Sequence, residues 1–257
     1  MAVRLLLNDA VPGAASPGDP LDAPALERLY AYPDRPWLRA NMVSTLDGAA
    51  AGNDGRTGTI NTPADLVVYT LLRDLADVIL VGAGTARAEG YMSADPRTGD
   101  RAARAVAEGR AAHPEMAVVS GTGQLPPLLA ERRENGGGVL LVTCEAAGAG
   151  ALDRARHTLG ADRVLVCGRE SVDLRAAVDA LVDRGLPRIL CEGGPRLLAD
   201  VAAADLLDEL CLTVVPLLAG GVEQRIAVGT SADAPLVPGV VIESEGTVLQ
   251  RWLRPEA

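Results

Sequence analysis

The stretch CEGGP at residues 191–195 joins a short apolar run, 188–190, to a segment with helical periodicity, 197–207. A strand that ends in a glycine pair and continues into a helix leaves unpaired backbone N–H groups and the positive end of the helix dipole facing outward. Such a turn favours phosphate binding. A second strand-to-glycine turn, VILVGAGT at 78–85, repeats the pattern. Together the two turns favour a nucleotide-dependent enzyme of the α/β class.

Composition narrows the classes of protein further. The chain has 257 residues, of which 48% are hydrophobic, so it can bury one large core and needs no second domain. A net charge of -10 disfavours binding to nucleic acid or to an anionic membrane surface. All 24 basic side chains are arginines. The absence of lysine excludes a lysine Schiff base or a lysine general base.

The four cysteines and two histidines do not form a metal-binding pattern. Cys144, Cys167, Cys191 and Cys211 stand singly in or after apolar runs, which favours buried strand cysteines in a reducing compartment. The apolar run at 5–7 is too short for a signal peptide, and no run reaches the length of a membrane span. We therefore predict a cytoplasmic protein without a bound metal.

Short apolar runs alternate with helical segments from residue 36 onward. This pattern predicts strands over 37–46, 78–82, 116–120, 138–143, 163–167, 188–191 and 209–215, with helices over 63–75 and 196–207 among them. Such alternation is typical of a mostly parallel, buried sheet with helices on both faces.

The two ends of the chain follow a different pattern. Apolar runs at 240–243 and 247–252 predict an antiparallel hairpin that turns at Glu245-Gly246. Residues 1–35 contain five prolines and one short helical pattern, so we expect an extension that packs on a single domain, 36–257.

Some candidate site residues have a plain alternative role. The GAG turn at 82–84 satisfies half of the dinucleotide-binding fingerprint, because Arg87 stands where the third glycine belongs, and a simple tight turn explains it equally well. Asp47 follows the first core strand, where it can cap a turn or face a ligand. Arg73 fits a solvated side chain paired with Asp74 or Asp77.

A series of arginines occupies the polar stretch 97–112. Arg97, Arg101 and Arg104 have the spacing of a solvated helix face or loop, and a phosphate clamp is the sharper alternative. Whether this stretch forms an ordered lid stays open at this point.

Taken in order, the motifs resemble the reductase domain of riboflavin biosynthesis. The resemblance rests on STLDG at 44–48, the helix that ends at Arg73, ADVILVGAGT at 76–85, CEGGP at 191–195 and DEL at 208–210. That family is the C-terminal half of a bifunctional deaminase-reductase and has a dihydrofolate-reductase-like fold. The chain has no H-x-E followed by P-C-x-x-C, the deaminase signature, so it is similar to a stand-alone reductase.

The resemblance implies NADPH as the cofactor and hydride transfer to C1′ of a ribosylaminopyrimidine phosphate. It implies substrate contacts at Thr57, Arg73 and Glu192, and an acid at Asp47 or Glu192 that orients the ring or supplies a proton. With the two glycine turns included, the expected cofactor contacts are Thr59, Gly82, Gly84, Thr85, Glu89, Ser120, Gly193, Gly194, Pro195, Arg196 and Leu197.

The departures from the family pattern lie on the substrate side. Family members usually carry a lysine near 39–41, where this chain reads Arg-Ala-Asn, and an aspartate in place of Glu89. They also commonly have a serine or aromatic pair in place of Thr57 and Thr59. Dihydrofolate-reductase-like reduction of a pteridine therefore stays open, as do an NADP(H)-binding protein without catalysis and a purely structural use of the fold.

The C-terminal part of the chain also suggests an assembly. The segment 210–218 is an apolar strand near the end of the chain, and an exposed sheet edge needs cover. We therefore expect a homodimer.

Overall fold

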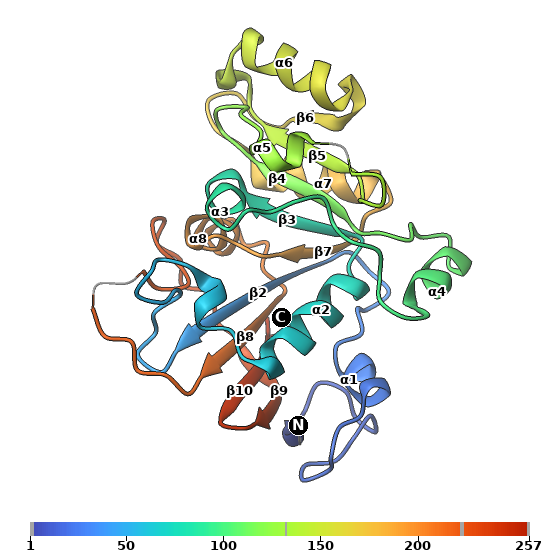
Figure 1. The fold of residues 1–257 in the computed structure, drawn as a ribbon, viewed down its shortest axis with the longest axis vertical. Helices are drawn as coiled ribbons and strands as arrows, with labels where there is room; N and C mark the ends of the chain where they lie inside the picture. Colours follow the sequence, from blue (N-terminus) through green and yellow to red (C-terminus); the bar gives the residue numbers. More distant parts are fainter. Residues whose placement is uncertain (1–2, 132, 222–223, 256–257) are drawn as a thin grey trace.

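A computed structural model describes residues 3–131, 133–221 and 224–255 as one sheet with helices on both faces (Figure 1). Within these residues the strand order is β1-β9-β10-β8-β2-β7-β3-β4-β5-β6. The parallel strands are β2 (Trp37–Thr45), β3 (Val78–Gly82), β4 (Glu115–Val119), β5 (Val139–Thr143), β6 (Val164–Val166), β7 (Arg188–Cys191) and β8 (Glu209–Val215). The antiparallel strands are β1 (Arg4–Asn8), β9 (Val237–Ser244) and β10 (Thr247–Leu253). The predicted α/β class with an antiparallel C-terminal hairpin is thus confirmed.

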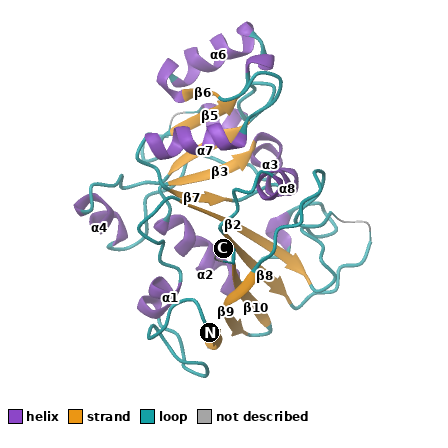
Figure 2. Cartoon of the chain, turned by 180° about the vertical axis from the view of Figure 1, so that it is seen from behind, coloured by secondary structure: helices purple, strands orange, loops and turns teal. Residues whose placement is uncertain are grey.

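Helices cover both faces of the sheet because the central strands are apolar on both sides. In β3, Ile79 and Val81 pack into one hydrophobic cluster and Val78 and Leu80 into the other. Figure 2 shows α7 and α8 in front of the sheet, whereas α2 lies behind it. The helices are α1 (Ala23–Leu29), α2 (Pro63–Leu75), α3 (Ala83–Ala88), α4 (Arg101–Ala107), α5 (Pro127–Ala130), α6 (Ala149–Leu159), α7 (Leu174–Asp183) and α8 (Pro195–Ala203).

Local sequence explains where the helices begin and end. The Thr62 side chain accepts the N–H of Asp65 and Pro63 opens the first turn, so α2 has the predicted bounds. Helix α8 ends at Ala203, earlier than the predicted residue 207, and Asp205 takes a φ of 57° just beyond it. That left-handed conformation cannot continue a right-handed helix.

The edges of the sheet differ from the sequence-based picture. Residues 4–8 of the N-terminal extension form β1, an edge strand that pairs with β9. Strand β8 lies between β2 and β10 and is not an edge. The reason for expecting a homodimer from segment 210–218 is therefore wrong, and the homodimer itself stays a prediction.

A buried charge network joins the parallel and antiparallel parts of the sheet. Glu209 on β8 receives two hydrogen bonds from Arg39 on β2, at 2.7 and 3.1 Å, and two from Arg251 on β10, at 2.7 and 3.0 Å. Burial opposes ionisation of Glu209, but the two guanidinium groups outweigh it and lower its pKa to about 2. Arg39 is fully buried in this network, so it is not available to a ligand.

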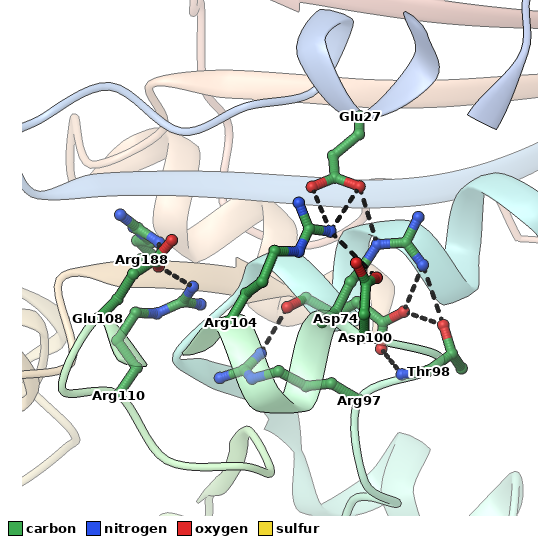
Figure 3. Close-up of polar contacts among 10 residues, drawn as sticks. Glu27, Asp74, Arg97, Thr98, Asp100, Arg104, Glu108, Arg110 and Arg188 are labelled. Atoms are coloured by element: carbon green, nitrogen blue, oxygen red, sulfur yellow. Dashed lines mark hydrogen bonds and ion pairs between the residues drawn. The ribbon is translucent and has the colours of Figure 1, made fainter. Parts of the chain in front are cut away.

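The arginine-rich stretch 97–112 lies at the opposite end of the strands from the glycine turns. Arg97 donates to the carbonyl groups of Asp74, at the end of α2, and of Ala76, between α2 and β3, at 2.6 Å each. On α4, Arg101 and Arg104 reach Glu27 of α1 (Figure 3). The stretch is an ordered connection between α1, α2 and β3 rather than a lid over the glycine turns. No helix among the described residues is long and apolar enough to cross a membrane.

Candidate active site

A cavity of about 550 Å³ opens at the carboxyl ends of β2 and β7. This is the end of a parallel sheet at which α/β proteins bind ligands. One wall comes from the segment 50–61 and helix α2, and the other from α3, the turn after β7 and the start of α8. Its lining residues are Asn41, Met42, Val43, Ala50, Ala51, Gly55, Thr57, Gly58, Asn61, Asp65, Tyr69, Gly84, Thr85, Ala88, Glu89, Tyr91, Glu192, Gly194, Pro195 and Gln224.

The two glycine turns meet at this cavity. The N–H of Gly82 donates to the carbonyl of Gly193 at 2.7 Å, which ties the start of α3 to the turn before α8. Gly194 is the N-cap of α8 and precedes Pro195, so the first free N–H groups of that helix face outward near the cavity. A Cβ atom on Gly194 would overlap the Thr85 hydroxyl. The absence of a side chain at Gly194 therefore lets the Thr85 hydroxyl lie against the start of α8.

Glu192 is held in place by three donated hydrogen bonds. Arg73 donates from Nε at 2.7 Å and from Nη2 at 2.6 Å, and the Tyr91 hydroxyl donates to Oε2 at 2.7 Å. The Glu192 side chain is only 3% exposed. A bidentate arginine pair of this kind fixes both the charge and the orientation of the carboxylate. Glu192 is thus an oriented anion at the cavity wall.

Two tyrosines enclose this pair. The Arg73 guanidinium lies 4.5 Å from the ring centre of Tyr69 and 5.3 Å from that of Tyr91. Burial and the nearby Glu192 carboxylate raise the pKa of both hydroxyl groups. Both tyrosines therefore stay protonated in the working range and act as hydrogen-bond donors.

Asp65 and Asn61 line the same cavity, and sequence reasoning missed both. Asp65 is buried on α2, and burial raises its pKa, partly offset by a hydrogen bond with the Thr213 side chain. The Oδ1 atom of Asn61 is buried without a hydrogen-bond partner among the described residues. A buried acceptor without a partner costs free energy unless a ligand or water satisfies it.

The structure gathers about half of the predicted site residues around the cavity. Those that line it are Thr57, Gly84, Thr85, Glu89, Glu192, Gly194 and Pro195. Arg73 supports Glu192 from behind. Glu89 accepts the N–H of Thr57 at 3.0 Å, so it fastens the turn at 57–59 to the end of α3.

Other predicted residues lie outside the lining. These are Asp47, Thr59, Gly82, Ser120, Gly193, Arg196 and Leu197. Thr59 donates to the Asp54 carboxylate and the Arg56 carbonyl within its own turn. Ser120 follows β4, farther along the carboxyl edge of the sheet, and Leu197 is buried in the core. Arg196 is exposed on the first turn of α8.

Asp47 is exposed and organises a loop. It accepts hydrogen bonds from the Thr45 hydroxyl at 2.5 Å and from the N–H groups of Gly220 and Ala219 at 2.6 and 3.2 Å. The Thr45 hydroxyl and the two backbone groups lower the pKa of Asp47 to about 2. This carboxylate thus fastens the segment after β8 to the turn after β2.

One sequence signal could have identified the missed side chains. Asp65, Tyr69 and Arg73 stand at i, i+4 and i+8 on α2, so they share one helix face. Of these three residues, only Arg73 is identified from the sequence, because the family pattern contains it. Among the described residues, no group of three or more His, Cys, Asp or Glu side chains could hold a metal ion.

Comparisons with known proteins find relatives in sequence and in fold. Two reductases named 2,5-diamino-6-ribosylamino-4(3H)-pyrimidinone 5′-phosphate reductase are similar in sequence. The protein from Archaeoglobus fulgidus is 28% identical over 73% of this chain and 83% of its own length. The one from Methanothermobacter thermautotrophicus is 29% identical over 76% of this chain and 84% of its own.

Solved structures show the same fold. A pyrimidine reductase-like protein from Corynebacterium diphtheriae superimposes with a TM-score of 0.78 at 24% identity, covering 90% of this chain and 99% of its own. The Thermotoga maritima deaminase/reductase gives a TM-score of 0.61 at 19% identity over 86% of this chain and 57% of its own. The family described as RibD C-terminal domain matches residues 36–237, a range that contains both glycine turns and most of the cavity wall. The chain belongs to the RibD C-terminal domain family.

Proposed function

We propose that the protein is an NADPH-dependent reductase of a ribosylaminopyrimidine phosphate, of the type that acts in riboflavin biosynthesis. The observation that carries the proposal is the cavity where the two glycine turns meet the oriented Arg73–Glu192 pair. Two relatives that match most of this chain are named as reductases of this kind.

The residues present fit a nicotinamide dinucleotide. Gly194 and Pro195 at the start of α8 line the cavity, and the free N–H groups of that helix start suit a phosphate. Gly84, Thr85 and Pro195, which line the cavity, would hold the cofactor, and Ser120 and Arg196 lie farther along the edge. When bound, this cofactor supplies a hydride. The chain itself orients the substrate through Glu192 and Thr57 and excludes water from the enclosed wall.

A pteridine is the second candidate substrate, and one observation favours it. Among the residues that line the cavity, none carries a positive charge, and Asn41 lies there near the point where family members usually have a lysine. Arg39 is buried in the sheet and cannot replace it. A substrate phosphate would need Arg73 or backbone N–H groups, whereas a neutral bicyclic ring needs neither.

The test is NADPH oxidation by the purified protein with each substrate, and NADH serves as the cofactor control. Turnover of the ribosylaminopyrimidine phosphate supports the proposal. Turnover of dihydrofolate alone replaces it with pteridine reduction. NADPH binding without oxidation of either substrate contradicts both and indicates a binding protein.

We also propose that the protein forms a homodimer, as is common for small enzymes. No surface is assigned to the contact, since β8 lies inside the sheet. Light scattering at micromolar concentration tests the proposal, and a monomer there contradicts it.

A further inference from the structure

The proposed reduction consumes a proton as well as a hydride, whichever substrate is used. With the ribosylamine, the bond between C1′ and the ring oxygen breaks, the oxygen takes a proton, and the hydride forms the new C–H bond at C1′. With a dihydropteridine, a ring carbon takes the hydride and the adjacent nitrogen takes the proton. In both cases the electron pair comes from NADPH, and an acid in the cavity must supply the proton.

Few groups in the cavity can be that acid. Its lining contains neither lysine nor histidine among the described residues; its titratable members are Asp65, Tyr69, Glu89, Tyr91 and Glu192. The two tyrosines hold their protons too firmly, since burial raises their pKa values. Glu192 accepts three hydrogen bonds, two of them from the Arg73 guanidinium, so both of its carboxylate oxygens are already engaged.

Glu89 has a structural role. Its Oε1 atom accepts the backbone N–H of Thr57 and so connects α3 to the 57–59 turn. Asp47 lies outside the lining, and three hydrogen bonds keep it ionised. Asp65 remains, and no ion pair to its carboxyl group is present among the described residues.

The surroundings of Asp65 suit a carboxyl group that carries a proton. It sits on the first turn of α2, 5% exposed, with the hydroxyl of Thr213 on β8 as its side-chain partner. The effect of burial exceeds that of this hydrogen bond, so the protonated form is favoured. Four residues earlier, Asn61 offers an unsatisfied buried oxygen to the same cavity.

We propose that Asp65 is the catalytic acid of this cavity and that Asn61 holds the substrate's heterocycle beside it. The Asp65 O–H bond breaks as the proton passes to the substrate oxygen or nitrogen, and solvent returns a proton between turnovers. The Asn61 Oδ1 atom accepts an N–H of the ring. The inference rests on the proposed reductase function but names a residue that the family pattern did not indicate.

The first experiment compares the pH dependence of single-turnover NADPH oxidation in the wild type and in Asp65→Asn. The wild-type rate should level off below the Asp65 pKa and fall above it. The variant should lose about 10²–10⁴-fold in rate. Its rate should rise without levelling as pH falls, because solvent then provides the proton. Asp179→Asn, an exposed change on α7, is the matched control and should behave as the wild type. If the rate of Asp65→Asn levels off at low pH as the wild-type rate does, the proposal is overturned.

The Thr213→Val variant tests whether Asp65 acts in catalysis or only supports the fold. Removing the hydroxyl takes away a hydrogen bond that lowers the Asp65 pKa, so the falling limb of the rate profile should move to higher pH. A loss of rate at every pH without this movement would mean that Asp65 acts only through the structure, and would overturn the proposal.

A measurement without substrate keeps this inference separate from the proposed function. Carbon-13 NMR of the carboxyl groups, with Asp65→Asn to assign the signal, gives the Asp65 pKa in the ligand-free protein. A pKa above the ordinary aspartate value of about 3.9 supports the acid even if neither candidate substrate is turned over. A value at or below it overturns the inference while NADPH oxidation is unaffected.

Discussion

At the scale of single residues, three carboxyl groups in and near the cavity have different roles. Glu192 is buried and paired with Arg73, Asp47 is ionised and exposed, and Asp65 is buried without a cation. The environment of each carboxyl group, not its identity, decides whether it orients a ligand, fastens a loop or carries a proton.

Replacing Arg73 with alanine should weaken substrate use and leave NADPH binding nearly unchanged. The change leaves the Glu192 carboxylate buried with the Tyr91 hydroxyl as its remaining partner of the three. We expect a rise in KM and a loss of about 2–3 kcal/mol in the free energy of unfolding, below the range for fully buried pairs because the Arg73 side chain is 24% exposed. Steady-state kinetics and urea unfolding provide the measurements.

Arg73→Lys is the control for this change. It keeps the charge but cannot donate two parallel hydrogen bonds, so it should recover part of the stability and little of the substrate use. Equal losses of NADPH and substrate binding in Arg73→Ala would contradict a substrate-side role.

At the scale of elements, the contact between α3 and α8 depends on a missing side chain. Gly194→Ala places a Cβ atom on the Thr85 hydroxyl, so either that hydroxyl moves or the two helix starts separate. We expect at least tenfold weaker NADPH binding by fluorescence titration. Combining it with Thr85→Ala removes the obstructing hydroxyl and should recover part of the affinity that Gly194→Ala loses. Failure of the double variant to recover any affinity would show that overlap is not the cause.

The buried network of Glu209 holds three strands together and makes stability depend on pH. Glu209→Gln leaves Arg39 and Arg251 without a counter-charge, so we expect a loss of at least about 3 kcal/mol in unfolding free energy. The folded-state pKa of about 2 lies below the unfolded value. The wild type should therefore keep this contribution above about pH 4.3 and lose it progressively as pH falls toward 2.

The acid unfolding profile of Glu209→Gln measures that contribution. The difference in stability between the wild type and the variant should shrink as pH falls. A difference that stays constant from neutral pH to pH 3 would contradict the assignment, with Asp179→Asn as a surface control.

Sequence predicted the elements best where local chemistry decides them. Thr62 and Pro63 fix the start of α2, and Glu245-Gly246 fixes the hairpin turn through their positive φ angles of 51° and 82°. Strand β1 was not predicted because its partner, β9, lies more than 230 residues away and a three-residue apolar run carries little signal alone.

About half of the candidate site could be predicted, because only some of its residues lie in motifs that are contiguous in sequence. Gly194, Thr85 and Glu192 stand in motifs that are contiguous in sequence. Asp65 faces the cavity because α2 packs beside β7 and β10, which is tertiary information. Conversely, Asp47 stands in a recognisable motif, but its carboxylate oxygens accept hydrogen bonds from the N–H groups of Ala219 and Gly220.

At the scale of the whole molecule, the N-terminal residues are part of the sheet. Leu5 on β1 is fully buried, whereas its neighbour Leu6 is 44% exposed. Leu5→Ala should cost about 2–4 kcal/mol of unfolding free energy, and the matched change Leu6→Ala less than about 1 kcal/mol. Urea unfolding of the two variants checks this. Equal effects would mean that β1 adds no stability to the core.

Strand β1 pairs with β9, and β2 and β8 pair with strands nearer the C-terminus. These pairings also set the order in which the chain can fold. As the ribosome releases the protein from its N-terminus, β1 can form backbone hydrogen bonds with residues 18–21 but has no partner strand until β9 emerges. Glu209 lacks its second arginine until Arg251 follows. The sheet can close only after nearly the whole chain is made, because long-range pairs form last. A chain cut short before β10 keeps an open edge and an incompletely neutralised buried acid. Truncated products therefore do not complete the sheet, and cellular proteases can degrade them.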